Sequence, residues 1–247
     1  MEITKEYLAK MIDHTLLKPN ASTKDLELLC EQAVLYSFGA VCVRPFDVRY
    51  AYKLLKGTGV KVCTVVGFPW GIQTTEAKVR ETCEAIYEGA TEIDMVINRG
   101  RLKEKYYPLF KQDINDVVLN AKTSTYAKDK IIVKTILETC ELKDDEIVQA
   151  CLLAKEAGAD FVKTSTGLYK GAKVKDVRLM HKTVPDLGVK ASGGIKDWKK
   201  AERLIKAGAT RLGTSSGVNI LSEYMKLAEP KREYHPNPVE PAKTDKY

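Results

Sequence analysis

A junction of one form recurs four times along the chain: a helix-like segment ends in Gly-Ala, and a β-rich run follows at once. The four junctions are Gly39-Ala40, Gly89-Ala90, Gly158-Ala159 and Gly208-Ala209. Glycine just past a helix end readily takes the left-handed conformation that stops the helix. Alanine is small enough to pack tightly where the next strand begins. The repeat therefore predicts helices and strands that alternate and join through short connections.

Between these junctions the hydrophobic pattern predicts eight strands. Some runs, such as 60–66 and 130–133, are almost continuously apolar, as expected for parallel strands buried on both faces. Apolar residues at helical spacing follow Thr75, Asp144 and Asp197, with Asp197 as an N-cap. We expect strands near residues 11–17, 40–43, 60–66, 92–97, 130–137, 160–164, 188–191 and 210–213.

Eight strand–helix units in 247 residues predict an α/β protein with a single (β/α)8 TIM barrel, a fold that typically takes about 250 residues. A doubly wound open sheet is the alternative. We assign the barrel to residues 1–228 and an extended tail to 229–247, which holds four prolines and four charges of each sign. The net charge of +7 therefore belongs to the barrel.

Composition and missing motifs exclude several classes of protein. No apolar run approaches the ~20 residues of a membrane span, and the N-terminus lacks the apolar core of a signal peptide. The six cysteines form no Cys-x-x-Cys pair, so we expect reduced thiols and a cytoplasmic protein. Motifs of nucleotide P-loops, dinucleotide folds, zinc proteases and serine hydrolases are absent. Three scattered histidines predict no metal site.

Charged residues lie inside the predicted apolar strands: Asp13, Asp94, Lys134, Lys163 and Lys190. A buried charge without a partner is costly, so these side chains should pair with one another or face a hydrated cavity. The three lysines stand on consecutive strands, and we expect them to converge at the C-terminal mouth, where barrel enzymes have their active sites. A buried ion-pair network that only holds the barrel together is the alternative.

Crowded lysines suit one kind of chemistry. A free amine with a pKa near 10.4 is neutral in roughly one molecule in 2,500 at pH 7, and only the neutral amine attacks a carbonyl. A second ammonium nearby, together with burial, can lower that pKa to roughly 7–8. A lysine pair with an aspartate therefore predicts Schiff-base chemistry. One lysine is the nucleophile, its neighbour keeps it neutral, and the carboxylate moves protons.

Two loops rich in glycine and serine predict an anion site. Ser192-Gly193-Gly194 follows the seventh predicted strand, and Gly-Thr-Ser-Ser-Gly at 213–217 follows the eighth. Each loop precedes a predicted helix, so backbone N–H groups, hydroxyl groups and helix N-termini can face one ligand. The loops after strands seven and eight are the usual phosphate site of such barrels.

These segments resemble the deoxyribose-phosphate aldolase family, class I aldolases built on a (β/α)8 barrel. The most specific part is the pair Lys-Thr-Ser-Thr-Gly at 163–167 and Lys-Ala-Ser-Gly-Gly at 190–194. The other matching segments are Ile12 to Pro19, Val41-Cys42-Val43, Gly67-Phe68-Pro69, Glu92 to Val96, Val133-Lys134 and Gly213 to Ser216.

The resemblance implies Lys163 as the Schiff-base lysine, Lys190 as the neighbour that lowers its pKa and Asp94 as the proton-relay carboxylate. The pocket residues that it implies are Asp13, Thr15 and Lys134, with the phosphate at Thr166, Gly167, Gly193, Gly194, Ser215 and Ser216. The implied reaction is reversible cleavage of 2-deoxy-D-ribose 5-phosphate to D-glyceraldehyde 3-phosphate and acetaldehyde, without metal or organic cofactor. The implied partners are these small molecules, with no nucleic acid and no membrane, and relatives are often homodimers.

Three residues depart from the family pattern. Lys170 and Lys173 stand where many relatives have a Gly and a Thr, and we expect both to be solvated rather than bound to phosphate. Trp70 stands where an aliphatic residue is commoner, and we expect it to pack at the barrel rim.

Three further residues have expected roles. In some relatives a C-terminal tyrosine reaches the site and assists proton transfer, and Tyr247 is the candidate here; a tail without that role is the alternative. We expect Cys42 to be a small buried residue and His14 to be a hydrogen-bonded core residue.

Three other functions stay open. A different Schiff-base aldolase would use dihydroxyacetone or pyruvate in place of acetaldehyde. A non-catalytic sugar-phosphate-binding barrel would bind its ligand without a covalent adduct. Nucleic-acid binding through the basic body would weaken steeply with salt, although no aromatic residues interleave with the basic ones.

Overall fold

Within residues 3–127 and 129–228, which the computed structural model describes, eight parallel strands close into a barrel. Each strand pairs with the next, and β8 pairs with β1. Every predicted strand is present within two residues of its expected bounds, so the predicted (β/α)8 barrel is confirmed and the open sheet is wrong. The strands are β1 (Ile12–Leu16), β2 (Ala40–Val43), β3 (Lys61–Val66), β4 (Glu92–Val96), β5 (Ile132–Ile136), β6 (Phe161–Lys163), β7 (Gly188–Ser192) and β8 (Arg211–Thr214).

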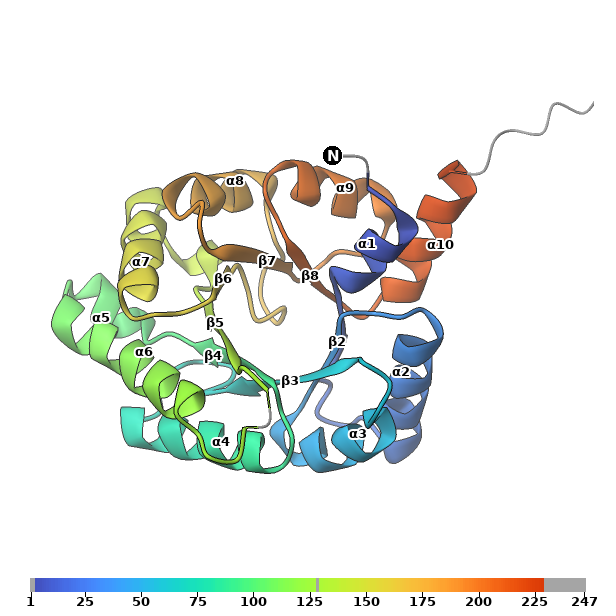
Figure 1. The fold of residues 1–247 in the computed structure, drawn as a ribbon. Helices are drawn as coiled ribbons and strands as arrows, with labels where there is room; N and C mark the ends of the chain where they lie inside the picture. Colours follow the sequence, from blue (N-terminus) through green and yellow to red (C-terminus); the bar gives the residue numbers. More distant parts are fainter. Residues whose placement is uncertain (1–2, 128, 229–247) are drawn as a thin grey trace, which may run out of the picture.

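Helices surround the barrel on its outside (Figure 1). No helix in the described ranges is long and apolar enough to cross a membrane. The predicted tail at 229–247, with Tyr247, lies outside the described residues. The helices are α1 (Lys5–Lys10), α2 (Thr23–Leu35), η1 (Pro45–Asp47), α3 (Val48–Leu55), α4 (Thr75–Tyr87), α5 (Arg99–Lys103), α6 (Tyr107–Lys122), η2 (Thr139–Glu141), α7 (Asp144–Glu156), α8 (Val174–Thr183), α9 (Trp198–Lys206) and α10 (Gly217–Ala228).

Three of the four Gly-Ala junctions have the predicted form. Gly89, Gly158 and Gly208 follow helix C-caps with φ between 85° and 111°. The first junction differs, because Ser37 takes the left-handed position there with φ 56°. Gly39 is needed for another reason: a Cβ at that position would lie 2.2 Å from the backbone carbonyl oxygen of Lys10.

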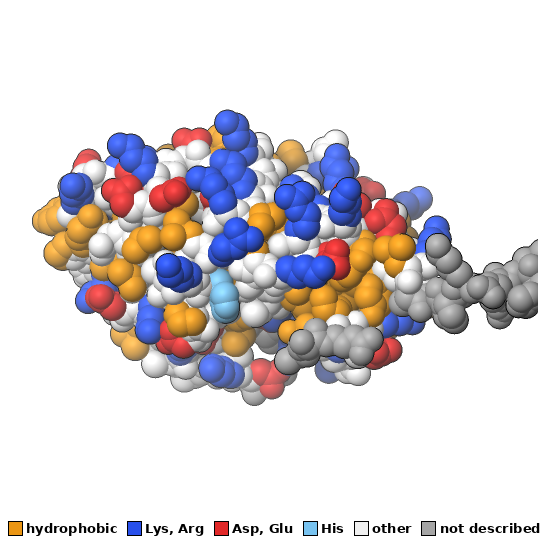
Figure 2. Space-filling view, turned by 90° about the horizontal axis from the view of Figure 1, so that it is seen from above, with side chains coloured by type: hydrophobic (Ala, Val, Ile, Leu, Met, Phe, Trp, Pro, Cys, Tyr) orange, Lys and Arg blue, Asp and Glu red, His pale blue; other side chains and the backbone are white. Residues whose placement is uncertain are grey.

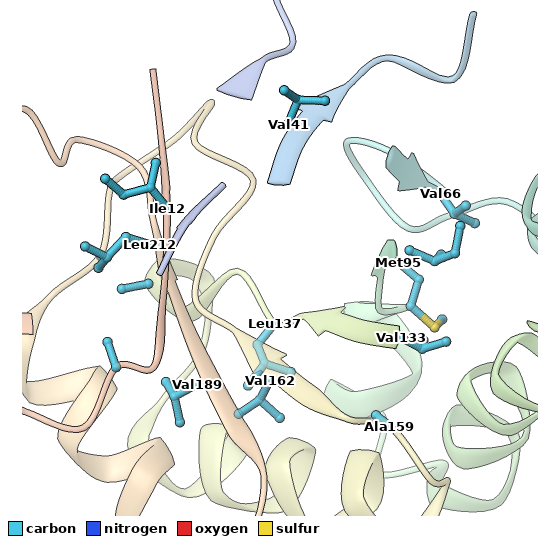
Figure 3. Packing of buried hydrophobic residues seen from close by; sticks show 14 of the residues in the cluster. Ile12, Val41, Val66, Met95, Val133, Leu137, Ala159, Val162, Val189 and Leu212 are labelled. Carbon is cyan, nitrogen blue, oxygen red and sulfur yellow. The ribbon is translucent and has the colours of Figure 1, made fainter. Parts of the chain in front are cut away.

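The apolar core lies between the barrel and its helices. Alternate strand residues such as Ile12, Val133 and Val189 face outward and are fully buried under the helices (Figure 3). The residues between them face the barrel axis, and on most strands these are charged. A second, smaller apolar cluster comes from β2 and β3: Ala40, Cys42, Cys63 and Val65. The barrel interior is therefore apolar on one side and charged on the other.

The surface carries the excess of basic residues. Figure 2 looks onto the side of the barrel above α8 and α9 in Figure 1, and Lys and Arg side chains gather on it. A positive surface of this kind attracts small anions over long range.

Candidate active site

One carboxylate joins the three strand lysines inside the barrel. Asp94, on β4, accepts hydrogen bonds from Lys163 Nζ and Lys190 Nζ at 2.7 Å, both on Oδ2, and from Lys134 Nζ at 2.9 Å on Oδ1. Asp94, Lys134 and Lys190 are fully buried, and Lys163 is 3% exposed. The strands bring these residues together because they alternate facing in and out, and each charge stands on an inward position.

The network continues away from the mouth through two residues that the sequence analysis missed. Arg211, on β8, donates to Asp13 at 2.6 Å and to Glu92 at 3.2 Å. Glu92 also binds Lys134 at 2.5 Å, and Asp13 binds Lys190. Both missed residues lie at the edges of predicted strands. The rule that selected Lys134, a charge within a strand, would have selected them too.

The lysines converge, but deeper than we expected. Of the five strand charges that the sequence singled out, only Lys163 lines the cavity at the C-terminal end of the barrel. Lys134 and Lys190 lie beneath it, closed off from solvent by their ion pairs. The expectation that all three would stand at the mouth is therefore wrong, because the inward positions of β5 and β7 that carry them lie within the barrel.

Ion pairing determines the protonation of the buried groups. Burial alone would raise the pKa of the Asp94 carboxyl, but Lys134, Lys163 and Lys190 together hold it well below its usual range. Burial alone would lower the pKa of Lys190, but Asp13 and Asp94 raise it above its usual range. The pKa of Lys134 is raised in the same way, by Asp94 foremost among the groups around it. Asp94 is thus a carboxylate, and Lys134 and Lys190 are ammonium ions, at neutral pH.

These shifts predict how stability depends on pH. Because the pKa of Asp94 is lower in the folded than in the unfolded state, the ionised carboxylate stabilises the fold. This stabilisation is present above the unfolded-state pKa of about 3.9 and is lost as pH falls toward the folded-state pKa. We expect the free energy of unfolding, from urea titrations between pH 2 and 7, to fall below about pH 4. The Asp94→Asn variant should show a shallower fall, and equal slopes in the two proteins would contradict this assignment.

A cavity of about 570 Å³ opens above Lys163. Thr15 on β1, the Thr166–Leu168 turn after β6, and the loops after β7 and β8 contribute to its wall. The Ser192 hydroxyl, in the same wall, is buried and has no hydrogen-bond partner among the described residues. The Schiff-base candidate therefore forms the floor of a cavity whose wall holds unused polar groups.

Backbone geometry sorts the six predicted phosphate residues into two groups. Gly167, Gly193, Gly194 and Ser215 line the cavity, and no acceptor among the described residues takes up their backbone N–H groups. The N–H of Thr166 donates to Glu138 at 3.0 Å, and that of Ser216 donates to the Thr214 hydroxyl at 2.9 Å. Ser216 also does not line the cavity. Four residues that line the cavity thus have N–H groups available to a ligand, and free backbone N–H groups of this kind can bind an anion.

The remaining predicted residues have the following places. Lys170 and Lys173 are exposed and do not line the cavity. Trp70 is half exposed, and its indole N–H donates to the Tyr169 hydroxyl at 3.2 Å, so it joins two loops of the rim. Buried His14 bonds to the Gln32 side chain at 2.8 Å, as expected for a core residue, and also lines the cavity.

Two groups of side chains have the donor types of a metal site. Cys42, Cys63 and Asp94 place ligand atoms within 4.8 Å of one another, and so do Asp13, Cys63 and Glu92. The carboxylates of both groups already bind lysine or arginine. These cations would repel a metal ion at the same oxygens, so we assign no metal to either group.

Comparison with known proteins gives consistent matches. The family model of the DeoC/LacD family aldolases matches residues 7–223. A deoxyribose-phosphate aldolase of Caldanaerobacter subterraneus is 53% identical over 221 residues, which are 89% of this chain and 94% of the relative. A deoxyribose-phosphate aldolase of Geobacillus sp. is 55% identical over 216 residues, 87% and 94% of the two chains. The tetrameric deoxyribose phosphate aldolase structure from Aeropyrum pernix has a TM-score of 0.83 at 34% identity, covering 91% and 93%.

Proposed function

The chain belongs to the DeoC/LacD family of aldolases, and on this premise we propose that it reversibly cleaves 2-deoxy-D-ribose 5-phosphate to D-glyceraldehyde 3-phosphate and acetaldehyde. Lys163 is the nucleophile in this proposal, with Lys190 and Asp94 as its partners and Asp13, Thr15 and Lys134 around them. Metal and organic cofactors have no part in the proposed steps. The single observation that carries the proposal is the shared Asp94 oxygen, which holds both lysine nitrogens at 2.7 Å beneath the cavity.

Charge balance supports Lys163 as the lysine that becomes neutral. The network holds four cations, Lys134, Lys163, Lys190 and Arg211, against the carboxylates of Asp13, Glu92 and Asp94. A neutral amine at Lys163 leaves three cations against three carboxylates. Lys163 is also the only lysine of this network that borders the cavity. Contact with the cavity therefore distinguishes Lys163 from Lys134 and Lys190, and a free amine at Lys163 stands where substrate arrives.

The proposed reaction proceeds through the Lys163 nitrogen. The neutral amine attacks the aldehyde carbon C1 of the open-chain sugar to give a carbinolamine, which takes up a proton and loses water to leave an iminium ion. Loss of the proton from the C3 hydroxyl then breaks the C2–C3 bond, and the electron pair moves into an enamine on Lys163. The released C3 becomes the aldehyde of glyceraldehyde 3-phosphate. Protonation of the enamine at C2 and hydrolysis release acetaldehyde, with Asp94 and a water molecule as proton carriers.

The phosphate of the substrate is assigned to the four free N–H groups. The N–H groups of Gly167, Gly193, Gly194 and Ser215 supply hydrogen-bond donors and partial positive charge. The family resemblance also implies Thr166 and Ser216, but their N–H groups donate to Glu138 and to the Thr214 hydroxyl. We therefore assign Thr166 and Ser216 supporting roles in shaping the loops.

Borohydride trapping tests the proposal. The protein is incubated with acetaldehyde, reduced, digested and analysed by mass spectrometry, and we expect the reduced adduct on Lys163. Dihydroxyacetone and pyruvate serve as the competing donors and should give no adduct. A folded protein that binds deoxyribose 5-phosphate but traps neither the sugar nor acetaldehyde would instead be a sugar-phosphate-binding barrel.

The C-terminal tyrosine is a separate proposal, since it lies outside the described residues. We propose that Tyr247 assists enamine protonation, as the family resemblance implies. Tyr247→Phe should then slow solvent deuterium incorporation into acetaldehyde by about tenfold or more, because the hydroxyl is the proton carrier. Tyr234→Phe, in the same tail, is the matched control. If both variants and the parent incorporated deuterium into acetaldehyde at the same rate, Tyr247 would have no role in enamine protonation.

Assembly and location complete the proposal. We propose a homodimer, which sedimentation would distinguish from the tetramer named for the Aeropyrum pernix structure. All six cysteines are free thiols, which supports a reducing compartment, and we propose the cytoplasm.

A further inference from the structure

A carboxylate that the proposed mechanism does not use lies buried near the cavity. Glu138 follows β5, is 0% exposed and has a left-handed backbone conformation, with φ 57° and ψ 61°. Its neighbours Leu137 and Thr139 each donate a backbone N–H at 2.9 Å to the chain at and after β6. Left-handed glutamate is uncommon, and a buried carboxylate is costly. Such strain is retained where the surrounding structure needs the residue in that place.

The Glu138 side chain holds one turn of the cavity wall. Its Oε2 accepts hydrogen bonds from the Thr166 backbone N–H at 3.0 Å and from the Thr166 hydroxyl at 2.5 Å. The same hydroxyl accepts the Leu168 N–H at 3.3 Å. One carboxylate oxygen and one hydroxyl group therefore fix both ends of the turn. Gly167, with its free N–H, lies at the centre.

This turn packs directly against the second phosphate loop. A Cβ on Gly193 would lie 3.2 Å from Gly167 Cα and 3.0 Å from Gly171 Cα, so the backbones are in close contact. Gly167 and Gly193 also share positive φ values of 93° and 86°. Their N–H groups can face one anion only while the Thr166–Leu168 turn keeps this position.

We propose that Glu138 is a positioning residue that orients the Gly167 N–H toward the substrate phosphate and so determines the preference for phosphorylated over unphosphorylated sugars. The inference rests on the proposed function. The charge of Glu138 cannot be the reason for its place, because a carboxylate close to a phosphate weakens phosphate binding. Arg99 Nη1, 4.0 Å from Oε2, offsets part of that charge. The hydrogen bonds to Thr166 are what the carboxylate contributes.

The test compares kcat/KM for 2-deoxyribose 5-phosphate with kcat/KM for 2-deoxyribose in three proteins. Glu138→Ala should lower the ratio at least about tenfold, mainly through KM of the phosphorylated sugar, because a contact displaced by about 1 Å can cost on the order of 100-fold. Glu138→Gln should keep the ratio within about threefold of the parent, since its amide oxygen can accept the same two hydrogen bonds. If charge alone mattered, Glu138→Gln would instead raise the ratio.

Two results would overturn the inference: an equal loss for both sugars in Glu138→Ala, or a Glu138→Gln variant that behaves like Glu138→Ala. If Glu138→Ala does not fold, Thr166→Val tests the same contact from the other side and should lower the ratio. Trapping with acetaldehyde, which has no phosphate, separates the two proposals. No adduct in the parent protein refutes the proposed function, whereas an adduct together with an unchanged ratio refutes the role of Glu138 alone.

Discussion

Lys163→Met should abolish cleavage of 2-deoxyribose 5-phosphate, with a loss of kcat on the order of 10⁴-fold or more, because the covalent intermediate cannot form. The side chain of methionine has nearly the length of lysine but no amine. The variant should still fold and bind the sugar phosphate, since the four free N–H groups of the phosphate loops are unchanged. Its borohydride adduct should be absent.

The same substitution has a second expected effect, on stability. Lys163 contributes the fourth cation of a network that has three carboxylates. Removing that charge should leave the urea unfolding midpoint equal to or above that of the parent, since a buried cation in excess is unfavourable. Lys170→Met is the matched control, because Lys170 is exposed and does not line the cavity. If the Lys163→Met variant were active and carried the reduced adduct on Lys190, the nucleophile would be Lys190 on the neighbouring strand β7.

Asp94→Asn should have the largest effect on stability. Asp94 binds three ammonium groups, and each of them would lose a charged partner in the interior. Breaking a buried ion pair by removal of one partner typically costs about 3–5 kcal/mol in free energy of unfolding. Loss of the proton carrier should also lower kcat about 10²–10⁴-fold.

Urea unfolding and steady-state kinetics of Asp94→Asn measure the two effects separately. Asp186→Asn is the control, because it removes a carboxylate from an exposed ion pair with Lys155 and should change neither quantity measurably. If Asp94→Asn were as stable as the parent, the three lysines would not need Asp94 as their charged partner. If the folded Asp94→Asn variant had the kcat of the parent, Asp94 would not carry protons in the reaction.

Much of the fold was predictable because its signals are local. Buried parallel strands show as short apolar runs, and helix ends show as caps such as Asp197, whose side chain accepts the Lys200 N–H at 2.7 Å. The one junction read wrongly, Ser37 to Gly39, has a tertiary cause. Its glycine is required by contact with the carbonyl of Lys10, far from the local helix end.

The charged residues of the candidate site could be picked out from the sequence, but their distance from the mouth of the barrel could not. A charge in an apolar strand indicates Lys134, Lys163 and Lys190, because burial of such a charge demands partners. Their depth depends on the stagger of neighbouring strands, which no single segment contains. Arg211 and Glu92 complete the network. Their roles become clear only when β8 is seen to pair with β1, so that Arg211 binds both Asp13 and Glu92 inside the barrel.

The order of strands and helices and the parallel barrel follow from short segments of the chain, since periodicity, capping and residue type act over a few neighbouring positions. Which lysines and glycines of the candidate site are free to act depends on the closed barrel. Of the three strand lysines Lys163 alone reaches the cavity, and Gly167 has a free N–H whereas the Thr166 N–H is bound to Glu138. The physical reason is that burial and hydrogen-bond availability depend on neighbours supplied by distant segments, which come together only when the barrel closes.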